Sequence, residues 1–100
     1  MAELNSQQRS YLKGLAMDMD ALFQIGKASL TPDFTAAIDE ALAKRELLKI
    51  SVLKNCTDDP LELANTVAER THSAVVQVIG RKIVLYRPAK KPKIELPVRK

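Results

Sequence analysis

The chain has 100 residues, a length that usually forms one domain around a single hydrophobic core. Hydrophobic residues make up 46% and charged residues 28%, and no apolar run approaches the ~20 residues that a membrane-spanning helix needs. The N-terminus lacks the basic and apolar regions of a secretory signal, and the single cysteine, Cys56, excludes an internal disulfide. We therefore expect a cytoplasmic protein that does not contact the membrane.

The charge is divided unevenly along the chain. Residues 1–87 carry eleven basic and eleven acidic side chains, so the net charge of +4 lies entirely in residues 88–100. This last segment also contains three prolines, and such a composition buries little apolar surface. We expect residues 1–87 to form the domain and residues 88–100 to form an extended, mobile basic tail. The tail either only raises solubility or also touches a polyanion.

Capping residues predict where three helices begin. Asn5 or Ser6 can cap the first helix, while Thr31 before Pro32 and Asp59 at the third start can cap the others. Short polar side chains accept hydrogen bonds from the free N–H groups of a first turn, and proline suits the first helical position. The side chains expected to face inward are Leu12, Leu15, Ala16 and Met19, then Phe34, Ala37, Ile38, Ala41 and Leu42, and finally Leu61, Ala64, Val67 and Ala68.

Four strands are expected in residues 21–25, 46–53, 73–79 and 82–87. One face of the second strand is apolar, whereas its other face is half polar and should be half exposed. The third strand is apolar on both faces except at Gln77, which predicts a central position in the sheet. Gly80 and Arg81 fit the two central positions of a type II′ hairpin turn.

These elements follow one another in the order α-β-α-β-α-β-β. Two βαβ units and a closing hairpin predict the α/β class, as a single compact domain whose mixed four-stranded sheet is packed with three helices. Periodicity leaves open whether the first helix joins the other two on one face or covers part of the opposite face.

The sequence offers no convincing catalytic or metal-binding group. Cys56 and His72 lie about one helix length apart, which is too far for a nucleophile and its base. We interpret His72 as a surface residue at a helix C-terminus and Cys56 as a small, buried or half-buried apolar side chain. Asp58 and Asp59 are more typical of a helix start than of a metal site, because a cation requires more oxygen ligands than these two residues supply. We therefore predict a protein that is not an enzyme and carries no metal or cofactor.

The segment Gly26, Lys27, Ala28 and Ser29, between the first strand and the second helix, is the best candidate for binding. Small residues let another backbone approach closely, and the free N–H groups of the loop and of the following helix attract an anion. Lys27 adds a full positive charge at the tip. A phosphate cradle of this kind is the GXXG loop of KH-type domains, although the same residues are also common in ordinary turns.

Four further basic residues could join this loop. They are Lys13, Lys49, Arg81 and Arg87, and each alone could equally be a solvated surface charge. Acidic residues are concentrated in the second and third helices, and a nearly neutral body must separate its charges in this way to bind RNA. The chain has only four aromatic residues, which favours recognition of the RNA backbone or shape over base stacking.

Six stretches, taken in order, resemble the CRM (chloroplast RNA splicing and ribosome maturation) domain family. They are YLKGLA at 11–16, FQIGK at 23–27, IDEAL at 38–42, RELLKI at 45–50, VQVIGR at 76–81 and VLYR at 84–87. The resemblance implies a non-catalytic RNA-binding domain with a KH-like fold, similar to the C-terminal domain of a bacterial initiation factor. It also implies RNA contact through Gly26 and Lys27. The family's usual glycine at the fourth loop position is Ser29 here, which either strains the loop or offers a hydroxyl to phosphate.

Bacterial members of this family resemble assembly factors that associate with precursors of the large ribosomal subunit. We therefore expect a monomer that binds structured ribosomal RNA through residues 26–29 and the start of the following helix. The alternative is a protein-interaction module that docks on a ribosomal protein through a sheet edge or the apolar first helix.

Overall fold

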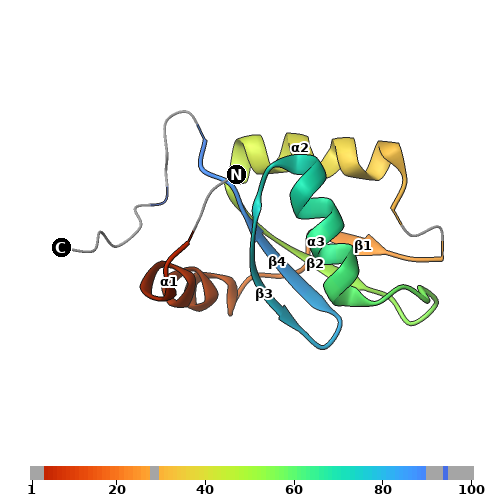
Figure 1. Cartoon of the computed structure of the whole chain (residues 1–100), viewed down its shortest axis with the longest axis horizontal. Coiled ribbons are helices and arrows are strands. Elements are labelled where there is room, and N and C mark those ends of the chain that lie inside the picture. The colour runs from red at the N-terminus through yellow and green to blue at the C-terminus, as the bar shows by residue number, and fades with distance from the viewer. Residues whose placement is uncertain (1–3, 28–29, 90–93, 95–100) are drawn as a thin grey trace.

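The computed structural model describes residues 4–27, 30–89 and 94. Within them, helices α1 (Ser6–Ala16), α2 (Pro32–Arg45) and α3 (Pro60–Thr71) alternate with strands β1 (Phe23–Ile25), β2 (Leu47–Val52), β3 (Ala74–Ile79) and β4 (Lys82–Tyr86) (Figure 1). The predicted element order and the α/β class are confirmed. No helix of these described ranges has the length and hydropathy to cross a bilayer.

The predicted helix starts are confirmed by their caps. Asn5, rather than Ser6, caps α1 and forms a capping box with Gln8, whose N–H donates to the Asn5 side chain at 2.8 Å. Thr31 and Asp59 cap α2 and α3, and each is followed by proline at the first helical position. Local side-chain bonds within three residues therefore determine where each helix begins.

The four strands form one mixed sheet in the order β1-β2-β4-β3. β1 runs parallel to β2, whereas β4 is antiparallel to both β2 and β3. The expectation of a central third strand is therefore wrong, because β3 lies at an edge and β4 is central. β3 is apolar on both faces because helices cover it from both sides: Val75 and Val78 pack against the α2–α3 side, and Val76 against the α1 side.

The β3–β4 hairpin has the predicted two-residue loop. Ile79 pairs with Lys82, so Gly80 and Arg81 are its central residues. Gly80 has φ +55, whereas Arg81 is not among the residues with positive φ. This combination is the one that a type II′ turn requires, which confirms the prediction.

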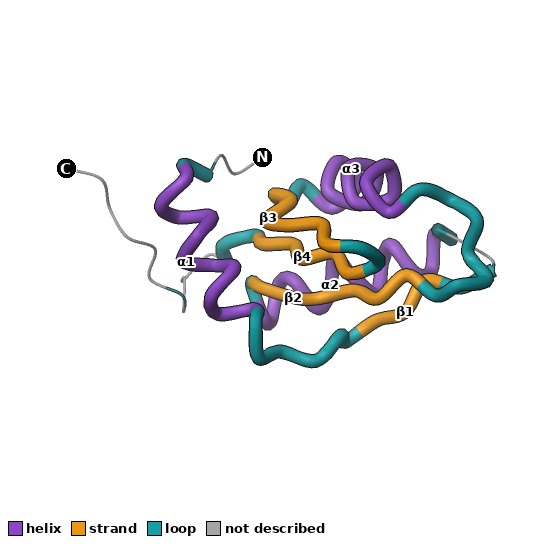
Figure 2. Tube along the Cα trace, turned by 90° about the horizontal axis from the view of Figure 1, so that it is seen from below, coloured by secondary structure: helices purple, strands orange, loops and turns teal. Residues whose placement is uncertain are grey.

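Two hydrophobic clusters lie on opposite faces of the sheet. α2 and α3 pack on one face against side chains such as Leu48, while α1 packs on the other against Leu47. The placement of α1, which periodicity left open, is thus on the face opposite α2 and α3, toward one end of the sheet (Figure 2). Leu47 is buried as a result, so the second face of β2 is less exposed than predicted.

Three other expectations need correction. Leu61 is 54% exposed, and Leu63 takes its predicted inward place in α3. Leu15, expected to face inward on α1, is 40% exposed, while its neighbours Leu12 and Ala16 are buried. β1 has only three residues, so Leu22 lies outside it and is exposed. Helical or strand spacing alone does not say which edge of an apolar stripe faces the sheet.

Candidate nucleic-acid interface

Three connections meet at one end of the sheet, away from α1: the β1–α2 loop, the β2–α3 turn and the β3–β4 hairpin (Figures 1 and 2). The Leu53 N–H donates to the Ile25 carbonyl at 2.8 Å, and the Arg81 guanidinium donates to the Leu53 carbonyl at 3.1 Å. Lys54, which is exposed, follows in the same turn. The fold therefore brings Arg81 and Lys54 to the base of the Gly26–Lys27 loop.

Lys27 is exposed, and within the described ranges it takes part in no hydrogen bond or ion pair. Gly26 does not adopt a positive φ, and a Cβ placed on it would meet Asn55 Oδ1 at 3.5 Å, an ordinary contact. Glycine is therefore not required at this position by conformation or space. Ala28 and Ser29 lie outside the described residues, so their part in binding stays a prediction.

The N-terminus of α2 has few donors left for a ligand. Pro32 has no N–H, and the Phe34 N–H donates to Thr31 Oγ1 at 3.1 Å. Of the first three helical residues, only Asp33 has an N–H for which the described residues provide no side-chain cap, and Asp33 itself is acidic. A negative side chain there competes with any bound anion for the positive end of the helix dipole. Lys27 is thus the main positive charge of this loop.

Lys13 and Lys49 lie together in a different place, a groove of about 400 Å³ on the α1 side of the sheet. The groove is lined by Lys13, Ala16, Met17, Lys49, Gln77, Ile79, Lys82 and Val84. The Lys49 ammonium donates to the Met19 carbonyl at 2.9 Å, and the Lys82 ammonium to Ser51 Oγ at 3.0 Å. Sequence reasoning missed Lys82, although its two-residue spacing from Val84 places both on one face of β4.

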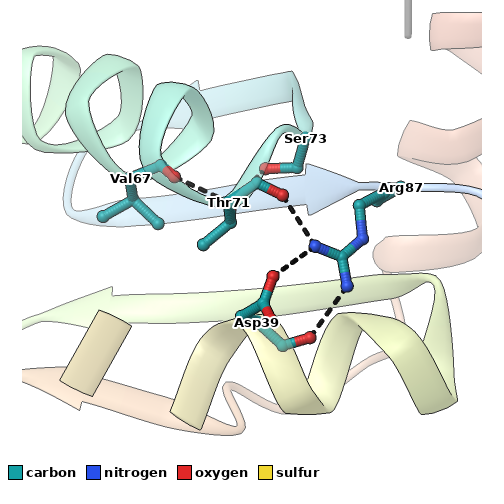
Figure 3. A network of polar contacts seen from close by, with 5 residues as sticks. All are labelled: Asp39, Val67, Thr71, Ser73 and Arg87. Atoms are coloured by element: carbon teal, nitrogen blue, oxygen red, sulfur yellow. Dashed lines mark hydrogen bonds and ion pairs between the residues drawn. The ribbon is translucent and has the colours of Figure 1, made fainter. Parts of the chain in front are cut away.

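Arg87 is held by contacts within the protein (Figure 3). Its guanidinium donates to the Thr71 carbonyl at 2.7 Å, to the Asp39 carbonyl at 2.9 Å and to the Asp39 carboxylate. The Thr71 hydroxyl in turn donates to the Val67 carbonyl at 2.7 Å. Arg87 thereby joins α2 and the C-terminus of α3 to the end of β4. It does not line the groove of Lys13 and Lys49, and its contact with RNA stays a prediction.

Sequence reasoning gave no role to Glu46, whose side chain is fully buried. Its backbone has φ 65 at the C-terminus of α2, and its carboxylate accepts the N–H groups of Ala89 at 3.2 Å and Ile94 at 3.1 Å. Burial raises the pKa of Tyr86, and the negative charge of Glu46 raises it further. Ile94 also packs against the α1-side cluster. Two points of the basic segment after β4 are therefore attached to the domain.

Cys56 and His72, the two residues considered for nucleophilic chemistry, lie in different surroundings. Cys56 is buried, and His72 is exposed at the end of α3, as predicted. The left-handed backbone of His72 was not predicted. Across the part of the chain that the structure describes, no three His, Cys, Asp or Glu side chains gather to hold a metal ion.

Sequence and fold both match known proteins. The model of the CRS1 / YhbY (CRM) domain family matches residues 4–87. The "Probable RNA-binding protein YqeI" of Bacillus subtilis is 40% identical over 95 residues, covering 94% of this chain and 99% of that protein. An "RNA-binding protein" of Haemophilus influenzae is 36% identical over 97 residues, covering 97% and 98%. The solution structure of the hypothetical protein SAV1595 from Staphylococcus aureus matches with a TM-score of 0.80 and 47% identity, covering 95% of this chain and all of that one.

Proposed function

Because the chain belongs to the CRS1 / YhbY (CRM) domain family, we propose that it binds structured ribosomal RNA in the cytoplasm, as a non-catalytic assembly factor for the large ribosomal subunit. Its relatives named as RNA-binding proteins support the RNA partner. In this proposal the phosphate backbone lies against the loop of residues 26–29 and the N-terminus of α2.

One observation supports this site most strongly. Lys27 is exposed and unpaired within the described ranges, at the end of the sheet that also holds Lys54 and Arg81. Phosphate groups supply most of the electrostatic affinity of RNA, and lysine and arginine are their usual partners. Since the first turn of α2 has an uncapped N–H only at Asp33 among the described residues, Lys27 should contribute most of the binding at this loop.

Exchange of Lys27 for alanine tests the proposal. We expect Lys27→Ala to weaken binding of a fluorescently labelled large-subunit RNA fragment about fivefold, since one charged contact contributes about 1 kcal/mol. The slope of log affinity against log salt should fall by about 0.7–0.9. Thermal unfolding should not change, because the side chain is exposed.

The matched control is Lys44→Ala, which removes an exposed lysine of α2 that pairs with Glu40 at 3.5 Å. It should leave both affinity and salt slope as they are. Equal RNA affinity of the wild type and Lys27→Ala would refute a role of this loop.

The basic segment 88–100 requires a different design. Deleting it would also remove the N–H donors of Ala89 and Ile94 from the buried Glu46 carboxylate and so disturb the fold. Glutamine at Lys90, Lys91 and Lys93 removes charge and keeps those donors. We expect a smaller salt slope, and an unchanged slope would mean that this segment does not touch phosphate.

Docking on a ribosomal protein remains the second candidate because of one exposed apolar pair. Tyr11 and Leu15 are 43% and 40% exposed and lie one turn apart on α1. Association with pre-ribosomal particles that survives RNase and high salt, and is lost in Tyr11→Ser, would favour protein docking over RNA binding.

A further inference from the structure

The groove beside α1 has an apolar surface open to solvent. Met17 and Ile79 are 77% and 61% exposed, more than any other large hydrophobic side chain in the described ranges. Met17 follows the end of α1 at Ala16, and neither Met17 nor Ile79 belongs to the buried cluster that α1 forms with Leu47, Val76, Val84 and Tyr86 of the sheet. Two such side chains in one groove are typical of an interaction surface rather than of scattered exposure.

Three lysines surround this apolar surface. Hydrogen bonds to the Met19 carbonyl and to Ser51 orient the ammonium groups of Lys49 and Lys82, and each ammonium keeps donors for a further partner. Lys13 is exposed, and its ammonium forms no hydrogen bond or ion pair with the residues that the structure describes. None of the three belongs to the ion pairs of Lys44 with Glu40 and Arg87 with Asp39. Their charges are therefore available to an anion.

These features match the parts of a nucleotide. The groove volume of about 400 Å³ is within the range of small-ligand sites, roughly 300–1,000 Å³. A base has two apolar faces, which fit Ile79 and the Met17 thioether, since methionine sulfur contacts aromatic rings favourably. Gln77 lines the same groove with an amide that both donates and accepts, as the edge of a base does.

We infer that this groove binds one unstacked nucleotide of the RNA, with its base against Met17 and Ile79 and its flanking phosphates on Lys13, Lys49 and Lys82. The inference rests on the proposed function, because it names a second contact of the same RNA. One RNA strand can reach both the Gly26–Lys27 loop and the groove. Lys82 of the groove directly follows Arg81, whose guanidinium donates to the Leu53 carbonyl at the base of that loop.

Two ten-nucleotide probes separate the base from the backbone. One is oligouridylate, and the other is an abasic ribose-phosphate chain of the same length. We expect Ile79→Ala to weaken oligouridylate binding about threefold and abasic binding not at all, because only the base loses apolar contact. Leu61→Ala is the matched control, since Leu61 is also exposed but lies on α3.

The charge is tested in parallel. Lys13→Gln should weaken both probes about threefold, because it removes a phosphate contact, whereas Lys44→Gln on α2 should weaken neither. Thermal unfolding of each variant verifies the fold, and amide NMR shifts should locate oligouridylate at residues 77, 79 and 82. Both measurements use the full chain.

The outcomes distinguish this inference from the proposed function. Equal effects of Ile79→Ala on the two probes, or no effect on either, would overturn it. It also fails if oligouridylate does not bind, or if a glutamate decapeptide displaces it equally well and shifts the same amides. If ribosomal RNA binding depends on Lys27 while the groove variants behave as wild type, the proposed function stands and the nucleotide site is wrong. If no variant, Lys27→Ala included, loses affinity for ribosomal RNA, binding by the loop of residues 26–29 is refuted as well.

Discussion

Glu46→Gln removes one negative charge from the interior and changes the shape of the side chain very little. The carboxylate is fully buried and accepts two backbone N–H groups, from Ala89 at 3.2 Å and from Ile94 at 3.1 Å. Glutamine can accept only one of them, because its amide N–H₂ group would face the other donor. The exchange therefore tests whether this carboxylate attaches the segment after β4 to the domain.

The magnitude follows from these two bonds. A hydrogen bond to a charged group contributes about 1.5–3 kcal/mol, and a neutral one about 0.5–1.5 kcal/mol. Losing two charged bonds and keeping one neutral bond should lower the free energy of unfolding by about 1.5–5.5 kcal/mol. For a domain of this size, even the lower value corresponds to a fall of at least ~6 °C in the unfolding midpoint.

Calorimetry or thermal circular dichroism measures this change. Glu40→Gln, on the exposed side of α2, is the control and should change the free energy by no more than about 0.5 kcal/mol. In a Tyr11→Phe background, ultraviolet titration should also show a lower pKa of Tyr86 in Glu46→Gln, because one of its two causes is gone. An unchanged or higher midpoint would refute the reasoning, since it would mean that the cost of burying the charge exceeds the gain from its bonds.

Three further predictions concern stability. Arg87→Ala should lower the free energy of unfolding by about 2–4 kcal/mol in a urea titration, because three hydrogen bonds joining α2 and α3 to β4 are lost; Asp39→Asn, which keeps the backbone bond, should cost less. Gly26→Ala should change the unfolding midpoint little, whereas Gly80→Ala, at φ +55, should lower stability by about 1 kcal/mol; equal effects would contradict the difference in backbone conformation. The folded state raises the pKa of Tyr86 above 10.0, so neutral Tyr86 contributes fully to the free energy of unfolding below that pH, and this contribution is lost as pH rises through the raised pKa. Urea midpoints that do not fall between about pH 9 and about pH 11 would contradict this.

The candidate loop could be located from the sequence, but the sequence did not show which of its groups can bind an anion. A small residue and a lysine between a strand and a capped helix predict an exposed turn, and Lys27 lies there. Among the described residues, the Thr31 cap and Pro32 leave one uncapped N–H in the first turn of α2, and this became clear only from the cap geometry. The groove could not be predicted from the sequence, since Lys13 and Lys49 are far apart in the chain and come together only when α1 packs on the sheet.

Arg87 and Glu46 show the same limit for charged residues. The sequence made Arg87 a candidate for RNA contact and gave Glu46 no role, and nothing within a few residues of either indicates its partners. Arg87 binds Asp39 across 48 residues, and Glu46 binds Ile94 across the same separation. Charge alone does not distinguish a side chain that meets a ligand from one that joins two helices.

The sequence by itself determined the number and order of the elements, the caps of α2 and α3 and the hairpin turn, because each depends on bonds and conformations within about four residues. Only the tertiary structure decided that β4 is central, that α1 covers the face opposite α2 and α3, and that three lysines surround one groove. Those features depend on which apolar surfaces are buried together, and such contacts join segments that are distant in the chain.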